Sequence, residues 1–512
     1  MNSNMTEQLD QLFRMWDRGL CPGAQVLIRQ HGKTLYEKCF GYGNLENKLK
    51  IHKESIFHVA SISKEFTVMS ILLLWKEGKL DLDDNIRKYL DEYINIETPI
   101  TIRQMMNNVS GLRDQWELLF LRGIKINDQI DMDDINTTIS LQKSLNFEPQ
   151  SQYLYSNTGF HLLALIVEKL SQMSFPQFVK ERIFTPLGMT HSFVRESFTQ
   201  IVPNLTYSYQ DEGDDTFYYN PLNYALYGPT SVNTCASDLC KVLDEYIHPN
   251  VINPEIIELM KKPVLLSNGK TAEYCGGLIT HKLHGLDVFG HGGADAAYRG
   301  EIICIPEKEL ELVLISNTTT YAMSKLADKA ACIVLGLPDC TEPAVPEHEN
   351  APAHSGVFLT ALPDDPMFVD ITEQNGTFYM QREWCRTELV KEEDGGYRIG
   401  SLDEKIYFTD NGILYRLPGR VLTLTPAKPA DPALFQEGIY YNDETDSFMK
   451  LVKVENTCEI HMRRHGKTTL YQSTSGSIIF RMDANLVMYV KAENDTIIMD
   501  GGRIKHIIYQ KQ

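Results

Sequence analysis

Long apolar runs are missing from this sequence. No stretch approaches the roughly 20 apolar residues of a membrane-spanning helix, because the longest candidates, near 69–75 and 161–167, are interrupted by charge within two turns. A basic segment followed by an apolar one, the pattern of a secretory signal, is also missing from the start of the chain. We therefore expect a cytoplasmic protein with no membrane span.

Basic residues are in deficit, with 49 Lys and Arg against 68 Asp and Glu and a formal net charge of −19. A surface of this sign repels polyanions, so nucleic acid and anionic membranes are not expected as partners. The ten cysteines have no paired spacing, which favours reduced thiols over disulfides in a cytosolic chain. The composition, 43% hydrophobic and 10% aromatic, is otherwise that of an ordinary globular protein.

The 512 residues predict several domains. Residues 1–340 have strand patterns at both ends and helices between them, which predicts an α+β unit with a mixed antiparallel sheet whose first and last strands meet. A linker rich in Pro and charge is expected at 341–352. Short alternating segments follow, and they predict two all-β antiparallel barrels, over 353–428 and 429–512.

Three short motifs bring together residues capable of acyl transfer. Ser61-Ile-Ser-Lys64 places a hydroxyl and an amine one turn apart at the start of a predicted helix. The free N–H groups and the dipole at such a helix start favour an oxyanion and help to keep the lysine amine neutral. Ser-x-x-Lys alone is weak evidence, since it occurs elsewhere in this chain.

The other two motifs strengthen the first by their order along the chain. Tyr155-Ser-Asn157 offers a phenol for proton transfer and an amide for binding a substrate amide. His291-Gly292-Gly293 precedes a strand pattern, and its small residues would let a substrate backbone lie against the strand edge.

The order and spacing of these motifs resemble the serine β-lactamase and penicillin-binding-protein superfamily, in its class C-like branch. The resemblance covers residues 10–335 and includes the connecting segments 102–112, 147–149, 185–189 and 237–239. The layout of a catalytic domain and two barrels is similar to that of bacterial D-aminopeptidases, in which a loop of the last barrel reaches the active site. The residues of that loop cannot be identified from this sequence.

The resemblance implies a role for each motif residue. Ser61 would be acylated, and Lys64 and Tyr155 would share the roles of base and acid. Asn157 would hold the substrate amide, while His291 would stand where β-lactamases carry a lysine. Gly292 and Gly293 would line the site, and the backbone N–H groups of Ser61 and Ala294 would form the oxyanion hole.

The resemblance predicts a D-stereospecific aminopeptidase that releases small N-terminal D-amino acids from peptides or amides. Such an enzyme needs a carboxylate for the substrate ammonium, and Asp114 and Asp295 are candidates because they lie near the motifs, although either could be a solvated surface acid. An esterase or β-lactam hydrolase of the same superfamily remains an alternative, as does a non-catalytic binding protein with this fold. No metal or cofactor is expected, and a homodimer is compatible with the sequence.

Overall fold

The computed structural model describes residues 3–212, 215–319, 322–339, 344–360, 367–381, 386–399, 404–417, 420–474, 476–483 and 486–512. Part of the predicted linker, 341–343, lies outside these ranges, as do Cys340 and Cys385. The cysteines within them are free thiols. None of the described helices has the length and apolarity needed to cross a membrane.

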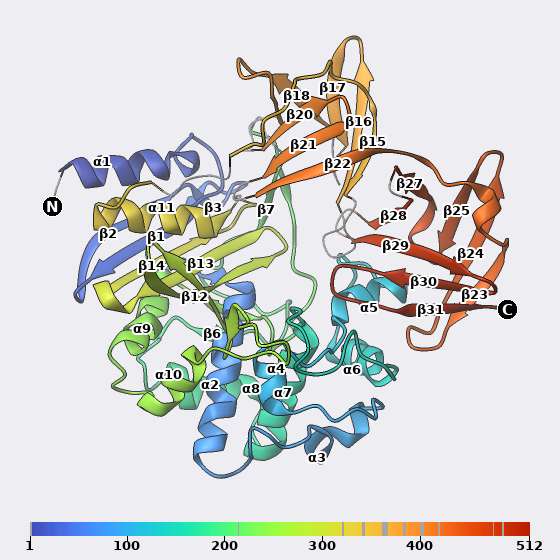
Figure 1. Cartoon of the computed structure of the whole chain (residues 1–512). Coiled ribbons are helices and arrows are strands. Elements are labelled where there is room, and N and C mark those ends of the chain that lie inside the picture. The colour runs from blue at the N-terminus through green and yellow to red at the C-terminus, as the bar shows by residue number, and fades with distance from the viewer. Residues whose placement is uncertain are drawn as a thin grey trace.

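An antiparallel sheet forms the centre of the first unit (Figure 1). Its described strands stand in the order β10 (Tyr274–Cys275), β11 (Leu278–Leu283), β12 (Leu286–Asp295), β13 (Tyr298–Ile305), β14 (Leu310–Ser316), β1 (Ala24–Gln30) and β2 (Lys33–Phe40). β1 pairs with β14 from Ala24↔Ser316 to Gln30↔Leu310. The first and last strands of the unit are therefore neighbours, as the sequence predicts.

Helices cover both faces of this sheet. Within β14, which is buried throughout, Leu312 and Leu314 pack with α1 (Ser3–Leu12) and α11 (Met323–Leu335). Val313 and Ile315 belong to a second cluster on the opposite face, together with residues of α2 (Ser63–Lys76) and α9 (Ala236–Ile247). Because successive strand residues face opposite ways, the uninterrupted apolar run of β14 is explained by burial on both faces.

Further helices and short strands complete the unit. The helices are α3 (Arg87–Leu90), α4 (Ile102–Met106), α5 (Gln115–Leu121), α6 (Met132–Ser140), α7 (Asn157–Ser171), α8 (Phe175–Val179) and α10 (Pro254–Lys261), with helical turns η1 (Arg14–Trp16), η2 (Ala60–Ile62), η3 (Asp91–Tyr93), η4 (Lys180–Phe184) and η5 (Pro306–Lys308). The small strands are β3 (Tyr42–Asn44), β4 (Leu49–Lys50), β5 (Phe57–His58), β6 (Phe193–Val194), β7 (Tyr209–Asp211), β8 (Phe217–Tyr219) and β9 (Val232–Thr234).

One strand is longer than its sequence pattern indicates. The apolar pattern ends at Phe289, yet β12 continues through the glycine-rich motif to Asp295. A Cβ at Gly290 would lie 1.8 Å from the carbonyl oxygen of Ile302 on β13. The glycine that weakens a strand by propensity is here the residue that allows the two strands to approach.

The remaining strands form two closed antiparallel barrels, which confirms the predicted fold class. The first contains β15 (Gly356–Thr360), β16 (Phe368–Gln374), β17 (Thr377–Gln381), β18 (Arg386–Lys391), β19 (Tyr397–Ile399), β20 (Lys405–Thr409), β21 (Gly412–Leu417) and β22 (Arg420–Pro429), and pairing of β15 with β22 closes it. The second, after the turn η6 (Pro432–Leu434), contains β23 (Gly438–Asn442), β24 (Ser447–Val454), β25 (Thr457–Met462), β26 (Gly466–Thr469), β27 (Tyr471–Ser473), β28 (Ile478–Asp483), β29 (Leu486–Glu493), β30 (Thr496–Asp500) and β31 (Ile507–Lys511), and pairing of β23 with β31 closes it. The domain limits drawn from the sequence stay a prediction.

The second barrel shares its hydrophobic core with the first unit. Leu118 and Leu121 of α5 are buried among the barrel residues Met488, Ile504 and Tyr509. Figure 1 shows α5 beside β29 and β30, although the two segments are far apart in the sequence. The barrel is thus fixed to the first unit by apolar burial as well as by polar contacts.

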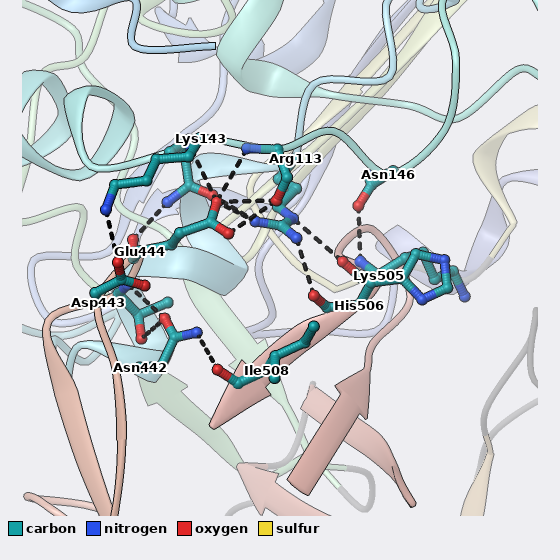
Figure 2. Close-up of polar contacts among 12 residues, drawn as sticks. Arg113, Lys143, Asn146, Asn442, Asp443, Glu444, Lys505, His506 and Ile508 are labelled. Atoms are coloured by element: carbon teal, nitrogen blue, oxygen red, sulfur yellow. Dashed lines mark hydrogen bonds and ion pairs between the residues drawn. The ribbon is translucent and has the colours of Figure 1, made fainter. Parts of the chain in front are cut away.

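A buried ion pair adds to this contact (Figure 2). The guanidinium of Arg113, 1% exposed, donates to Glu444 over 2.7 Å and to the carbonyl oxygens of Lys505 and His506 over 3.2 and 3.1 Å. Burial lowers the pKa of Arg113, while the charge of Glu444 opposes this shift. The neighbouring pair of Lys143 and Asp443 is mostly exposed, at 62% and 60%.

These adjacent pairs allow a matched test of the contact. Glu444→Ala leaves the buried guanidinium of Arg113 without its anionic partner, so we expect a loss of about 3 kcal/mol of stability. Asp443→Ala removes an exposed pair, for which we expect less than about 1 kcal/mol. Thermal unfolding should show a clearly lower Tm for the first variant alone. Equal shifts in the two variants would contradict the importance of burial here.

Candidate active site

The turn that carries Ser61 is held against strand β12. Ser61 lies in η2, directly before α2, and the preceding Ala60 has φ 48°, a left-handed conformation that is uncommon for a residue other than glycine. A Cβ at Gly293 would lie 2.3 Å from the carbonyl oxygen of Val59. Glycine at 293 therefore lets β12 pass immediately beside the helical turn η2, which carries Ser61.

The amine of Lys64 is buried within hydrogen-bond distance of three oxygens. Its Nζ lies 3.0 Å from Ser61 Oγ, 2.8 Å from Asn157 Oδ1 and 2.9 Å from the carbonyl oxygen of Pro229. Burial lowers the pKa of Lys64 well below its usual value, while the charge of Asp114 opposes the shift. The spacing predicted from the sequence motif is thus realised in three dimensions.

The same three contacts suit a neutral amine. Asn157 Oδ1 and the Pro229 carbonyl oxygen accept hydrogen bonds and cannot donate them. A neutral amine has two N–H groups for these acceptors and one lone pair, which is then left for the Ser61 hydroxyl. The arrangement can therefore receive the proton of Ser61.

Asn157 is oriented by Asp114. The backbone N–H and the side-chain Nδ2 of Asn157 both donate to Asp114 Oδ2 over 2.8 Å. Because Nδ2 faces the carboxylate, Oδ1 faces Lys64. Asp114 also caps α5 by accepting from the backbone N–H of Trp116, and it is fully buried. Proximity in sequence made Asp114 a candidate for binding an ammonium, but its contacts place it inside the protein.

The phenol of Tyr155 lies at the same centre. Lys64 Nζ is 4.8 Å from the centre of the Tyr155 ring. Burial raises the pKa of Tyr155 above its usual value, and the hydrogen bond with Ser61 partly opposes this. The structure thus brings Ser61, Lys64, Tyr155 and Asn157 together.

His291 lies beside Tyr155 with a defined tautomer. Its Nδ1 is 2.5 Å from the carbonyl oxygen of Gly292, an acceptor, so Nδ1 carries the proton. Its Nε2, 3.1 Å from Tyr274 Oη, then accepts the hydrogen bond of that phenol. Burial, followed by the charge of Lys64, lowers the pKa of His291 to about 3.

Two contributors to this centre were not predicted from the sequence. Tyr274, on β10, has no motif around it beyond the following glycines. Arg503 belongs to the second barrel, and its guanidinium carbon lies 5.2 Å from the centre of the Tyr155 ring. Only the general expectation of a loop from the last barrel pointed towards Arg503.

Strand β12, which carries the His291-Gly-Gly motif, has an unpaired edge. β11 pairs with β12 from Leu283↔Leu286 to Ile279↔Gly290, and among the described residues no strand continues this pairing along 291–295. Ala294 is exposed in this stretch, and Gly292 is partly exposed. An extended peptide could add to such an edge next to Ser61.

Asp295, at the end of this edge, has its contacts within the protein. His58 Nε2 and Thr230 Oγ1 lie 3.0 and 2.9 Å from Asp295 Oδ2, and the phenol of Tyr224 donates to Oδ1. Burial raises the pKa of Asp295, but these hydrogen bonds and the charge of His58 outweigh it, and the pKa is lowered. Asp295 thus fixes the strand end rather than standing free.

One group of potential metal ligands occurs among the described residues, away from these motifs. Ligand atoms of His191, Cys235 and Asp238 lie within 4.8 Å of one another. The carboxylate of Asp238 already accepts from the backbone N–H of His191 and from the hydroxyl of Ser192, and Lys241 pairs with it. These contacts hold the carboxylate of Asp238 among its protein partners.

Fold and site define a serine hydrolase of the β-lactamase/transpeptidase-like type. A sequence profile of the family named Beta-lactamase matches residues 8–333. This match covers more than half of the chain, which therefore belongs to the beta-lactamase family.

Relatives extend the similarity beyond the profile. Penicillin-binding protein 4* of Bacillus subtilis (strain 168) is 27% identical over 430 residues, which are 80% of this chain and 95% of that protein. A D-aminopeptidase of Gluconobacter oxydans (strain 621H) is 28% identical over 320 residues, 62% of this chain. The chain matches 59% of the length of that D-aminopeptidase.

Solved structures share the fold. The octameric penicillin-binding protein homologue from Pyrococcus abyssi aligns with a TM-score of 0.57 at 20% identity, over 91% of this chain and 99% of its own. The D-amino acid amidase from Ochrobactrum anthropi SV3 complexed with D-phenylalanine aligns with a TM-score of 0.55 at 20% identity, over 65% and 99%. At these identities the likeness is one of fold.

The protonation of His291 can be checked directly. We expect its imidazole to stay neutral at pH 5, where an ordinary histidine of pKa about 6.5 is mostly protonated. NMR of ¹⁵N-histidine-labelled protein would follow this resonance, assigned by its loss in His291→Gln. Since the unfolded state binds this proton near pH 6.5 and the folded state only near pH 3, the contribution of His291 to stability falls as pH falls through this window. A His291 titration near pH 6.5 would contradict the burial argument.

Proposed function

We propose that this protein hydrolyses an amide beside a small D-configured residue through an acyl-enzyme on Ser61. The observation that carries the proposal is the buried amine of Lys64, whose contacts with Asn157 and Pro229 leave its lone pair for the Ser61 hydroxyl. This is the arrangement that an activated serine nucleophile requires.

The reaction then has two balanced halves. Ser61 Oγ attacks the substrate carbonyl carbon while its proton passes to Lys64, and the backbone N–H groups of Ser61 and Ala294 bind the oxyanion. Tyr155 gives a proton to the departing amine as the amide C–N bond breaks, and Lys64 restores the proton of Tyr155. Water next attacks the acyl ester, gives up a proton to the same pair of residues, and releases Ser61 with its proton regained.

A more specific version of this proposal is an aminopeptidase that releases small N-terminal D-amino acids. The similarity to a D-aminopeptidase and the fold shared with a D-amino acid amidase support it. It requires an anion for the substrate ammonium, and the two carboxylates nearest to the motifs, Asp114 and Asp295, are both engaged within the protein.

A DD-peptidase-like hydrolase is the second candidate, because the residue that faces Tyr155 from the second barrel is a cation, Arg503. The similarity to a penicillin-binding protein over 80% of the chain supports the same candidate. Both candidates use the same acyl-enzyme chemistry, and they differ in the charge that the substrate brings next to the scissile bond.

A small substrate panel separates these candidates. We expect D-alanine p-nitroanilide to be hydrolysed at least about tenfold faster than its L-enantiomer, and Ser61→Ala to lose about three orders of magnitude or more. Faster turnover of the free amine than of its N-acetyl derivative favours the aminopeptidase. Turnover of a simple ester or of nitrocefin without amide hydrolysis would keep the acyl-enzyme and reject the amide substrate, whereas no turnover at all would reject the catalytic proposal.

The pKa of Lys64 leads to a pH prediction. Because burial lowers this pKa well below its usual value of 10.5, we expect the acidic limb of the kcat/KM profile to lie well below pH 10. Lys64→Arg keeps a cation but removes the base, so it should lose most activity at every pH. A profile that rises only near pH 10 would show that Lys64 is charged in the resting enzyme.

A further inference from the structure

The second barrel delivers one of its loops to the catalytic residues. The loop joins β30 to β31. The backbone N–H of Arg503 donates to both carboxylate oxygens of Glu117 over 3.0 Å. Its carbonyl oxygen accepts from Asn146 Nδ2 over 3.0 Å and from the backbone N–H of Asp114 over 3.3 Å. The backbone position of Arg503 is therefore fixed by residues of the first unit.

The loop is fixed on both sides of Arg503. A Cβ at Gly501 would lie 2.7 Å from Glu117 Oε2, so the chain passes directly over this carboxylate. On the other side, the backbone N–H of Lys505 donates to Asn146 Oδ1 over 2.7 Å. The carbonyl oxygens of Lys505 and His506 are bound by Arg113, as Figure 2 shows. A loop held at so many points keeps its backbone in place before substrate arrives.

The side chain of Arg503 faces the site and remains accessible. Its guanidinium carbon lies 5.2 Å from the centre of the Tyr155 ring, while 44% of the side chain is exposed. Nη1 forms an ion pair with Asp114 Oδ2, and their separation of 3.7 Å is too long for a hydrogen bond. Among the described residues no acceptor is within hydrogen-bond distance of this guanidinium, so its planar set of donors is available to a ligand.

We propose that Arg503 binds a carboxylate of the substrate, so that the second barrel selects peptides with an anionic group near the scissile amide. A guanidinium binds a carboxylate through two parallel N–H···O bonds, which fixes position as well as charge. Carboxylates are the anions that peptide substrates carry, either at the C-terminus of the residue that leaves or on the acyl side. This inference rests on the proposed function, since it takes the Ser61–Tyr155 centre as the place of reaction.

The charges around Arg503 are consistent with this assignment. Asp114 is the nearest anion, but its Oδ2 already receives two hydrogen bonds from Asn157. Glu117 faces the backbone of Arg503 and accepts from its N–H. A substrate ammonium would meet the positive guanidinium, whereas a substrate carboxylate would complete its donors.

Binding to an inactivated enzyme tests the inference without relying on turnover. In the Ser61→Ala background, calorimetry would compare acetyl-D-alanyl-D-alanine with its C-terminal amide, and succinyl-D-alaninamide with acetyl-D-alaninamide. The first pair tests a carboxylate on the leaving residue and the second a carboxylate on the acyl side. We expect the acid of one pair to bind about tenfold or more tightly than its neutral partner.

The assignment to Arg503 then depends on variants. Arg503→Met should abolish the preference for the acid, while Arg503→Lys should retain part of it. Arg464→Met is the matched control, because Arg464 lies on the same barrel with 48% of its side chain exposed and pairs with Asp128 of the first unit. This control should keep the preference, and circular dichroism would confirm that each variant is folded.

Each outcome decides the inference. Equal binding of acid and neutral ligand in both pairs, absence of binding, or a preference that survives Arg503→Met would overturn it. Hydrolysis of a neutral ester by the enzyme with Ser61 intact reports the proposed function separately. Ester turnover without any acid preference would leave the acyl-enzyme standing and reject Arg503 as the carboxylate ligand.

Discussion

The burial of one amine is the constraint on which the rest of the site depends. Removing Lys64 from water disfavours its charged form, and its hydrogen bonds must come from the surrounding protein. Its partners Ser61, Asn157 and Pro229 lie on three separate segments of the chain. The amine therefore fixes the relative positions of η2, the start of α7 and the segment before β9, and each of these segments must be packed precisely enough to keep it paired.

Helix α5 connects this amine to the second barrel. Its capping residue Asp114 orients Asn157, and one turn later Glu117 binds the backbone of Arg503. Along the same stripe of the helix, Leu118 and Leu121 lie in the barrel core. A seven-residue helix has little stability of its own. Docking of the barrel and alignment of Asn157 thus depend on the same element, so the barrel is coupled structurally to the candidate active site.

Local chemistry explains what could be predicted from the sequence. The Ser61–Lys64 spacing is one helical turn, and the glycines after His291 indicate a close approach of another segment to the strand. Both features can be recognised from residues that are adjacent in the sequence. The fold class followed equally from alternating and helical patterns. Asp114 was a candidate ligand for an ammonium because it lies close to a motif, and that role stays a prediction. An Asp directly before a helix is also the pattern of a capping residue, and the structure places Asp114 in that position.

Long-range contacts explain what could not be predicted. Arg503 is 348 residues from Tyr155 along the chain, and nothing in its surroundings distinguishes it from any other surface arginine. The contact of Tyr274 with His291 likewise depends on the strand register that places β10 beside His291. Closure of the second barrel and the burial of α5 decide the position of Arg503, and the pairing of β10 and β12 with β11 decides that of Tyr274. Both are properties of tertiary structure.

The neutral imidazole of His291 affects which positive charges lie near Tyr155. Here Tyr274 occupies Nε2 and the Gly292 carbonyl occupies Nδ1, so the imidazole offers neither a charge nor a free donor. The cation next to Tyr155 that we propose to bind the substrate is instead Arg503 of the second barrel. Because Arg503 also lowers the pKa of Lys64, the binding of an anionic substrate that we propose at Arg503 would weaken this effect and favour proton transfer from Ser61 to Lys64.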